Sequence, residues 1–336
     1  MGSHRRLAPS GLDRGAGVAV SLLSVAAALG AVPAAAAPYD DTRAEVDRLY
    51  EQAEKATEAY NAADERADAL REEVGTARDR IARQQQRINS MRESLGSLAG
   101  AQYRSGGIDP AVALLFSDDP DDYLDKASRL DRVTAHQAGE LKDLQNAMRE
   151  LAQDREETAD KLRELERSRE AVAAHKKSVE RKLASARRLL DSLPDSERDA
   201  YDRASRSGRG DLPHPGGAPA ASGRGAAAVA AARSALGKPY VWGANGPTGF
   251  DCSGLMQWSY AQAGVSLPRT SQAQRFAGRQ VPLSEARPGD LVVYRADASH
   301  VGMYMGDGQV IHAPYPGAPV RYDPVGMMPV SSVTRV

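Results

Sequence analysis

Three side chains in the last third of the chain together have the chemistry of an activated nucleophile. Cys252 is the only cysteine among the 336 residues, and it follows a Gly/Pro-rich loop, 246–249, at the expected start of a helix. Free backbone N–H groups and the dipole at a helix start favour a thiolate, so we expect the pKa of this thiol to lie below about 8.5. His300 and His312 are the only histidines after residue 225. A thiolate, an imidazole and a polar group that fixes the imidazole tautomer make a cysteine nucleophile and its base.

Each of these residues also has a more ordinary interpretation. A lone cysteine is usually a small buried hydrophobe, and two histidines on a hairpin are often core residues. They could also bind a metal, but neither a third histidine nor a suitably spaced carboxylate pair accompanies them. An isolated thiol flanked by Asp251 and Ser253 is harder to explain as core filling in an exported protein. We therefore favour catalysis by Cys252, His300 and His312.

The two histidines can cooperate only if they lie on the same face of a β-hairpin. Strand-like segments occur at 290–295, 299–305, 309–313 and 319–322. A three-residue loop at 306–308 places Gly302 opposite His312 and directs both imidazoles to one face. A two-residue loop at Asp307-Gly308 would direct them to opposite faces. We expect the three-residue loop.

The N-terminal half has the repeat of a coiled coil. Apolar or small residues recur at steps of three and four from Val46 to Leu98 and again from Leu141 to Leu193. Gly, Pro and Asp residues between the two runs stop both helices. Residues 39–204 are thus predicted to form a long antiparallel coiled-coil hairpin, with a small apolar helical knob at about 106–130. The pattern leaves open whether the knob packs on the hairpin, on a partner or on the other domain.

Composition and charge bound the remaining possibilities. The 44 Lys and Arg residues nearly balance the 45 Asp and Glu residues, which argues against a nucleic-acid-binding protein. A single cysteine excludes an intrachain disulfide and a cysteine-based zinc site.

Residues 1–36 are predicted to be a signal peptide, because arginines precede an uncharged stretch that ends in an alanine run; a membrane span is the alternative. Residues 205–225 are expected to be a flexible Gly/Pro linker before a catalytic domain, 226–336.

The last 110 residues resemble the NlpC/p60 cysteine peptidases. The resemblance lies in five segments in the family's order, which are Tyr240–Gly243, Asp251–Leu255, Leu267–Ser271, Arg287–Leu291 and His300–Tyr304. It implies a papain-like α+β fold with an antiparallel sheet, secretion to the cell envelope, and hydrolysis of peptidoglycan stem peptides, commonly at the D-isoglutamyl–meso-diaminopimelyl bond, without a cofactor.

The resemblance also assigns roles to residues. Cys252 matches the nucleophile, His300 the general base and His312 the orienting third member. Four further residues match positions that line the substrate groove, namely Tyr240, Asp251, Ser253 and Arg269. Ala244-Asn245 departs from the family's usual second glycine, which affects the shape of that loop but not the triad.

The N-terminal half resembles, less specifically, the hairpin coiled coils of exported division-associated wall hydrolases. That resemblance implies docking to a membrane division complex and restraint of the enzyme by the coiled coil. Two other functions remain open. One is a catalytically idle coiled-coil regulator of another wall hydrolase, which the complete Cys/His/His set disfavours. The other is an acyltransferase or lipid-directed enzyme on a papain-like scaffold, which would keep the same triad.

Overall fold

The computed structural model describes residues 39–104, 112, 120–206 and 222–336. The predicted signal peptide lies outside the described residues, as do most of the predicted linker and the first part of the predicted knob. Tyr39–Val336 form one compact unit that contains a helical hairpin and a sheet domain. Across the described ranges, every helix is too short or too polar to span a bilayer.

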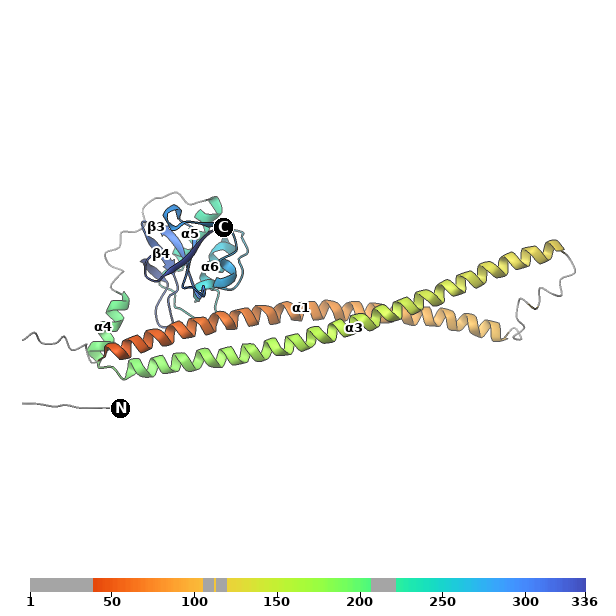
Figure 1. Cartoon of the computed structure of the whole chain (residues 1–336), viewed down its shortest axis with the longest axis horizontal. Coiled ribbons are helices and arrows are strands. Elements are labelled where there is room, and N and C mark those ends of the chain that lie inside the picture. Colours follow the sequence, from red (N-terminus) through yellow and green to blue (C-terminus); the bar gives the residue numbers. More distant parts are fainter. Residues whose placement is uncertain (1–38, 105–111, 113–119, 207–221) are drawn as a thin grey trace, which may run out of the picture. The chain divides into compact units, whose positions relative to one another are not determined.

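The hairpin consists of α1 (Asp40–Arg104) and α3 (Pro120–Asp191), which lie side by side in Figure 1, followed by α4 (Asp195–Arg206). The contacts are antiparallel, because they join the start of α1 to the end of α3: Lys182 donates to Gln52, whereas Arg80 binds Asp154 farther along. The buried seam confirms the predicted repeat. It contains Val46, Ala53, Ala67, Leu70, Val74, Ala77 and Ile88 of α1 and Leu144, Leu151, Leu165, Val179, Leu183 and Ala186 of α3.

The predicted knob at 106–130 differs from the structure in its second half. Residues 120–130 belong to the long helix α3, which begins at Pro120. Proline suits the first helical position, because its missing N–H would have no partner there and its fixed φ is already helical. The Asp-Pro-Asp segment that was expected only to stop a helix therefore also starts one.

The C-terminal domain is a six-stranded antiparallel sheet with two helices packed on it. Its strands are β1 (Arg279–Val281), β2 (Leu291–Tyr294), β3 (His300–Gly306), β4 (Gln309–His312), β5 (Arg321–Pro324) and β6 (Val330–Arg335), in the order β1-β6-β2-β3-β4-β5. The short helices α7 (Ser271–Gln274) and η1 (Leu283–Glu285) precede β1 and β2. This agrees with the predicted α+β class.

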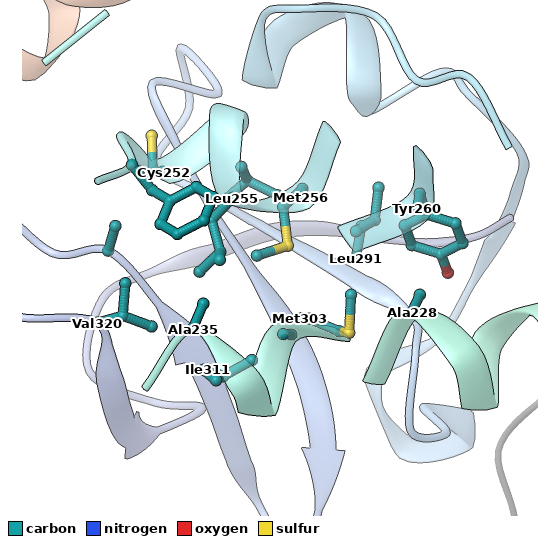
Figure 2. Close-up of a cluster of buried hydrophobic side chains, with 14 of the residues drawn as sticks. Ala228, Ala235, Cys252, Leu255, Met256, Tyr260, Leu291, Met303, Ile311 and Val320 are labelled. Atoms are coloured by element: carbon teal, nitrogen blue, oxygen red, sulfur yellow. The ribbon is translucent and has the colours of Figure 1, made fainter. Parts of the chain in front are cut away.

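The core of this domain lies between the sheet and the helices α5 (Gly223–Ser234) and α6 (Cys252–Gln262). Figure 2 shows Leu255, Met256 and Tyr260 of α6 packed with Leu291 and Met303 of the sheet. Burying such apolar side chains is the main stabilising contribution to a domain of this size. Helix α5 starts three residues before the predicted domain boundary at residue 226, because the side chain of Ser222 caps it by accepting from Gly225 N–H.

The β3–β4 hairpin has the predicted face but not the predicted turn. Its turn is the two-residue Asp307-Gly308, both at positive φ, as a type I′ turn requires. The register then shifts between Tyr304 and Gly306, so that Met305 is an extra residue in β3. Because of this extra residue, the strand residues before the bulge pair as they would with a three-residue loop. A Cβ on Gly302 would lie 3.2 Å from His312 Cβ, so these two residues are opposite each other as expected.

Candidate active site

Cys252 is the first residue of α6, as its sequence context predicted. Asp251 is the N-cap, with extended backbone angles, and its Oδ1 accepts from Gly254 N–H at 2.7 Å. Gly254 is required because a Cβ there would lie 2.2 Å from the carbonyl oxygen of Ala244. The cap and the glycine together hold the loop against the helix start, and they fix the position of the thiol.

The two histidines of the β3–β4 hairpin lie in contact with each other. His300 Nε2 is 2.8 Å from His312 Nδ1, and both rings are buried. The backbone N–H of Val301, the residue after His300, hydrogen-bonds to Cys252. The structure thus brings Cys252, His300 and His312 together, while their catalytic roles remain a prediction.

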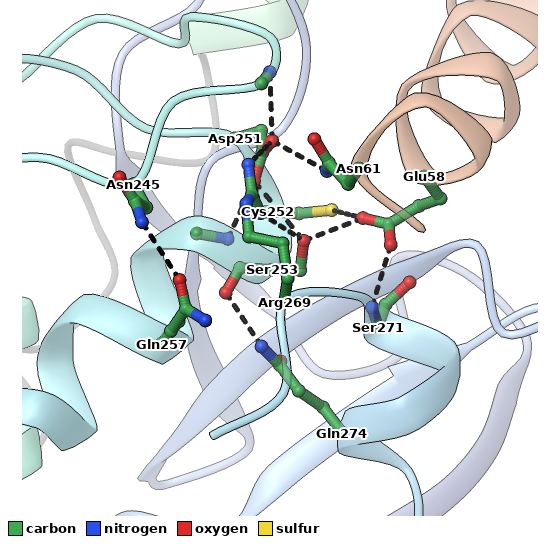
Figure 3. A network of polar contacts seen from close by, with 12 residues as sticks. Glu58, Asn61, Asn245, Asp251, Cys252, Ser253, Gln257, Arg269, Ser271 and Gln274 are labelled. Carbon is green, nitrogen blue, oxygen red and sulfur yellow. Dashed lines mark hydrogen bonds and ion pairs between the residues drawn. The ribbon is translucent and has the colours of Figure 1, made fainter. Parts of the chain in front are cut away.

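Three of the predicted groove residues form a polar cluster beside the thiol, shown in Figure 3. Arg269 Nη2 lies 2.5 Å from Asp251 Oδ2, and its Nη1 donates to Ser253 Oγ at 3.0 Å. Such two-point contacts between Arg and a carboxylate are strong and directional. Asp251 also accepts from Gly243 N–H at 3.0 Å. Asp251 and Arg269 therefore brace the loops around the site.

Tyr240, the fourth predicted groove residue, is buried close to the same cluster. Burial raises its pKa well above the ordinary value, and the negative charge of Asp251 raises it further. Its hydroxyl thus remains protonated, which suits a hydrogen-bond donor.

A carboxylate from the hairpin covers the thiol. Glu58 of α1 accepts at Oε1 from Ser253 Oγ at 2.8 Å and from Cys252 Sγ at 3.5 Å. Its Oε2 accepts from Ser271 N–H at 2.8 Å, so it joins the starts of α6 and α7 (Figure 3). Cys252 is only 2% exposed in this arrangement.

A second carboxylate, one helical turn earlier, covers the imidazole. Glu54 Oε1 lies 3.0 Å from His300 Nδ1, and its Oε2 lies 2.6 Å from Arg295 Nη1. Asn61, one turn after Glu58, donates to Asp251 at 3.1 Å. One face of α1 therefore occupies the entrance to the site.

The electrostatics of this closed arrangement oppose a thiolate. Burial raises the pKa of Cys252 well above its ordinary value, and the charges of Glu58, Asp251 and Glu54 add to that rise. The thiol is thus a neutral donor to Glu58, which differs from the lowered pKa expected from the helix start alone. Burial together with the charge of Asp251 raises the pKa of Glu58 itself to about 7. The dipole is outweighed because α1 supplies carboxylates and excludes water.

The sequence interpretation missed four residues of the site. Glu54, Glu58 and Asn61 lie outside the predicted seam of the coiled coil and were not singled out, although they recur at the 4-3 spacing of one helix face. Asp323 lies one residue beyond the predicted last strand, and its Oδ2 is 2.8 Å from His312 Nε2. A polar stripe beside an Ala-rich seam was the signal for the first three.

The sheet domain is similar to a known protein family. The NlpC/P60 family model matches residues 237–333. A probable endopeptidase of Corynebacterium glutamicum is 49% identical over 125 residues, which cover 37% of this chain and 59% of that protein. The probable endopeptidase p60 of Listeria monocytogenes is 52% identical over 97 residues, covering 28% and 20%. The crystal structure of the P60 domain of an antigen from M. avium subspecies paratuberculosis is 38% identical, covers 33% of this chain and 93% of that one, and has a TM-score of 0.32. This chain spans less than two thirds of the length of the two probable endopeptidases.

Proposed function

Because the NlpC/P60 family model matches residues 237–333, we propose that this protein is a cysteine endopeptidase that cleaves peptidoglycan stem peptides. The observation that carries the proposal is the position of Cys252 at the start of α6, where its sulfur is hydrogen-bonded by the backbone of Val301, the residue after His300 of the contacting pair His300 and His312. The proposed bond is the D-isoglutamyl–meso-diaminopimelyl amide, and the proposed location is the cell envelope after export. Relatives named probable endopeptidases support the reaction class.

The residues divide the work as follows. His300 takes the thiol proton, and the Cys252 thiolate attacks the amide carbonyl carbon. Backbone N–H groups at the start of α6 bind the oxyanion of the tetrahedral intermediate. His300 then protonates the leaving amine as the C–N bond breaks, which leaves a thioester, and it activates the water that hydrolyses this thioester. His312 orients His300, while Asp251 and Arg269 hold the groove.

The proposal also includes a restraint, in which the hairpin keeps the catalytic residues covered. Each reactive group is covered by its own carboxylate, Cys252 by Glu58 and His300 by Glu54. Glu54 contacts His300 at Nδ1, since Nε2 is already bonded to His312. The closed chain therefore lacks both a thiolate and a free base, and α1 must leave the site before a peptide strand enters. Docking of the hairpin to a membrane division complex is the proposed occasion for release.

Cleavage of purified sacculi by the full chain and its variants tests both parts. Glu54→Ala/Glu58→Ala is expected to raise the rate at least about 10-fold, because hydrogen bonds to charged groups contribute about 1.5–3 kcal/mol each. The matched control is Glu65→Ala/Glu72→Ala, two exposed glutamates of the same helix, which is expected to leave the rate unchanged. We call Glu54→Ala/Glu58→Ala the released variant. Adding Cys252→Ala to it is expected to abolish cleavage.

The outcomes separate the alternatives. A released variant that folds but cleaves no wall peptide would leave the idle regulator as the better description. Equal rates for the parent and the released variant would remove the restraint and keep the peptidase. Mass analysis of the released peptides identifies the bond.

A further inference from the structure

The site contains a fourth member beyond the predicted triad. We propose that Asp323 is a positioning residue which, through His312, determines the ring nitrogen of His300 that accepts the thiol proton. The inference rests on the proposed peptidase function, but most of its test does not need a substrate.

The chain of contacts is continuous and short. His300 Nε2 lies 2.8 Å from His312 Nδ1, and His312 Nε2 lies 2.8 Å from Asp323 Oδ2. The same Oδ2 accepts from Arg321 Nε at 2.6 Å. Both histidines are buried, and the carboxylate of Asp323 is largely shielded from solvent. Such a chain is polarised along its length, so a change at one end affects the other.

The sheet register explains why these four side chains meet. Side chains alternate along a strand, and residues directly opposite each other share a face. Gly302 lies opposite His312, so His300, two residues from Gly302, is on the face of His312. His312 pairs with Arg321, and Asp323 lies two residues farther along β5. Three neighbouring strands thus present the relay on one face.

The hydrogen-bonding capacities fix the protons between His300, His312 and Asp323. An ionised carboxylate can only accept, so His312 Nε2 carries the proton that it donates to Asp323. A neutral imidazole has one N–H, so His312 Nδ1 is an acceptor and His300 Nε2–H donates to it. In neutral His300 without Glu54 beside it, Nδ1 is then the ring nitrogen whose lone pair is free to accept the thiol proton. In the closed arrangement the carboxylate of Glu54 lies 3.0 Å from this nitrogen, a contact that suits an N–H there.

The charge states are those that this arrangement needs. Burial lowers the pKa of His312 to about 4, against the opposing effect of Asp323, so His312 is neutral at neutral pH. Burial alone would raise the pKa of Asp323, but the hydrogen bond from His312 and the charge of Arg321 lower it. A neutral His312 beside an ionised Asp323 transmits orientation without taking the thiol proton itself.

The test is the pH dependence of alkylation of the full chain by iodoacetamide. Cys252 is the only cysteine, so each label reports this thiol. Glu54→Ala/Glu58→Ala serves as the parent, since it uncovers the thiol. Three charged or titratable groups lie near the relay and the thiol in that parent. Arg321 donates to Asp323, the ring of Tyr294 lies 5.9 Å from that of His300, and Arg295 lies near Cys252.

Asp323→Asn is expected to slow alkylation at neutral pH about 10- to 100-fold, as losing the partner that orients a functional histidine does. It should also move the rise in rate toward the pH of an ordinary thiol, because the amide can donate to His312 and present the wrong tautomer. The matched control is Asp290→Asn, another buried aspartate of the sheet domain, paired with Arg335. The control should lower the melting temperature and leave the pH profile unchanged.

Two further measurements complete the test. In a His312→Ala background, Asp323→Asn should have no additional effect, because its effect passes through His312. In the parent itself, ¹⁵N shifts of the ring nitrogens should show His312 as the Nε2–H tautomer between pH 6 and 8, whether or not the Asp323 variants fold. A pH profile of Asp323→Asn that matches the parent, or an Nδ1–H tautomer of His312, overturns the relay. Failure of the parent to cleave sacculi, with these results intact, contradicts only the peptidase function.

Discussion

At the residue scale, the thiol of Cys252 is buried and its neighbours raise its pKa. A helix start lowers a thiol pKa, whereas a nearby carboxylate and loss of water raise it. In the closed arrangement the second pair of effects is larger, and the pKa of Cys252 is raised. Removing α1 removes Glu54, Glu58 and the barrier to water together. The same thiol therefore has two states that differ in reactivity without any change in its own backbone.

Glu58 makes closure depend on pH. Its pKa is near 4.5 in water and about 7 in the closed site, so the closed arrangement holds its proton more tightly than the open one. The resulting stabilisation is complete below about pH 4.5 and is lost as the pH rises to about 7. Opening should increase over that window, by at most about 10-fold per pH unit for one proton.

The measurement is the alkylation rate of Cys252 in the full chain, divided at each pH by the rate in Glu54→Ala/Glu58→Ala. The charged groups facing Glu58 are Asp251 and Arg269 of the sheet domain and Glu54 of its own helix. Burial alone would raise the pKa of Glu54, but His300 and Arg295 lower it, so its contribution is lost only in more acid solution. Glu58→Gln should flatten the ratio, and a ratio that falls with pH in the unmodified chain contradicts the assignment.

At the element scale, the bulge at Met305 is what reconciles a two-residue turn with histidines on one face. Tyr304 pairs with Val310 and Met303 with Ile311, while Gly306 pairs with Gln309. Met305 is the residue left over between these two registers. The pairing that places the histidines is therefore the one made by the residues of β3 that precede the bulge.

Two single-residue deletions in β3 should differ in their effect on activity. Without Met305, Tyr304 and Val310 remain paired, so His300 and His312 keep one face. Without Met303, the residues of β3 that precede Tyr304 shift by one position relative to β4. The side chain of His300 then turns to the other face of the sheet. Both deletions remove a buried methionine, which costs about 2–5 kcal/mol by comparison with Met→Ala.

The released variant carrying each deletion is assayed for sacculus cleavage at low temperature, with circular dichroism as the folding control. Deletion of Met303 should reduce the rate at least about 100-fold, comparable to the loss of a general base, while deletion of Met305 keeps most of it. Similar rates for the two folded deletion variants would show that the face of His300 is not set by this register.

Local patterns predicted the elements well. The start of α6 at Cys252 follows from a Gly/Pro loop with a capping aspartate, and the seam of the hairpin follows from a repeat that continues for many turns. The bulge was not predicted, because both turn lengths place glycine where a positive φ is needed, and sequence spacing alone does not choose between them. Asp323 was missed for a related reason, since its role depends on its register with His312 across two strands.

At the scale of the whole molecule, the contact between the hairpin and the sheet domain could not be predicted from the sequence. In the sequence, Glu54 and Glu58 look like ordinary coiled-coil residues. The fold brings Glu58 into contact with Cys252, which is 194 residues later in the chain. The polar contacts are flanked by aromatic ones. Tyr50 of α1 stacks on Tyr315 with ring centroids 4.9 Å apart, and Tyr60 meets the edge of Trp242 at 5.2 Å. These rings hold α1 on the domain without touching the thiol or the imidazoles.

The aromatic contacts allow closure to be weakened at a distance from the chemistry. Tyr50→Ala/Tyr60→Ala is expected to increase alkylation of Cys252 in the full chain several-fold to about 100-fold, since each aromatic pair contributes about 0.5–1.5 kcal/mol beyond its buried area. Sacculus cleavage should rise in parallel, because the catalytic side chains are unchanged. The matched control is Tyr103→Ala near the end of the same helix, where the ring is 85% exposed, and it should leave both rates unchanged.

Combining the variants separates the effect of the aromatic contacts from that of the carboxylates. In Glu54→Ala/Glu58→Ala, where closure is already weak, the tyrosine substitutions should add little, because both sets of contacts act on one equilibrium between closed and open chains. Additive effects of full size would mean that the tyrosines influence the thiol by another route. Unchanged alkylation in Tyr50→Ala/Tyr60→Ala, with Glu54→Ala/Glu58→Ala still activated, would mean that the carboxylates close the site without the aromatic contacts. The proposed restraint would then be confined to one face of α1 around Glu54, Glu58 and Asn61.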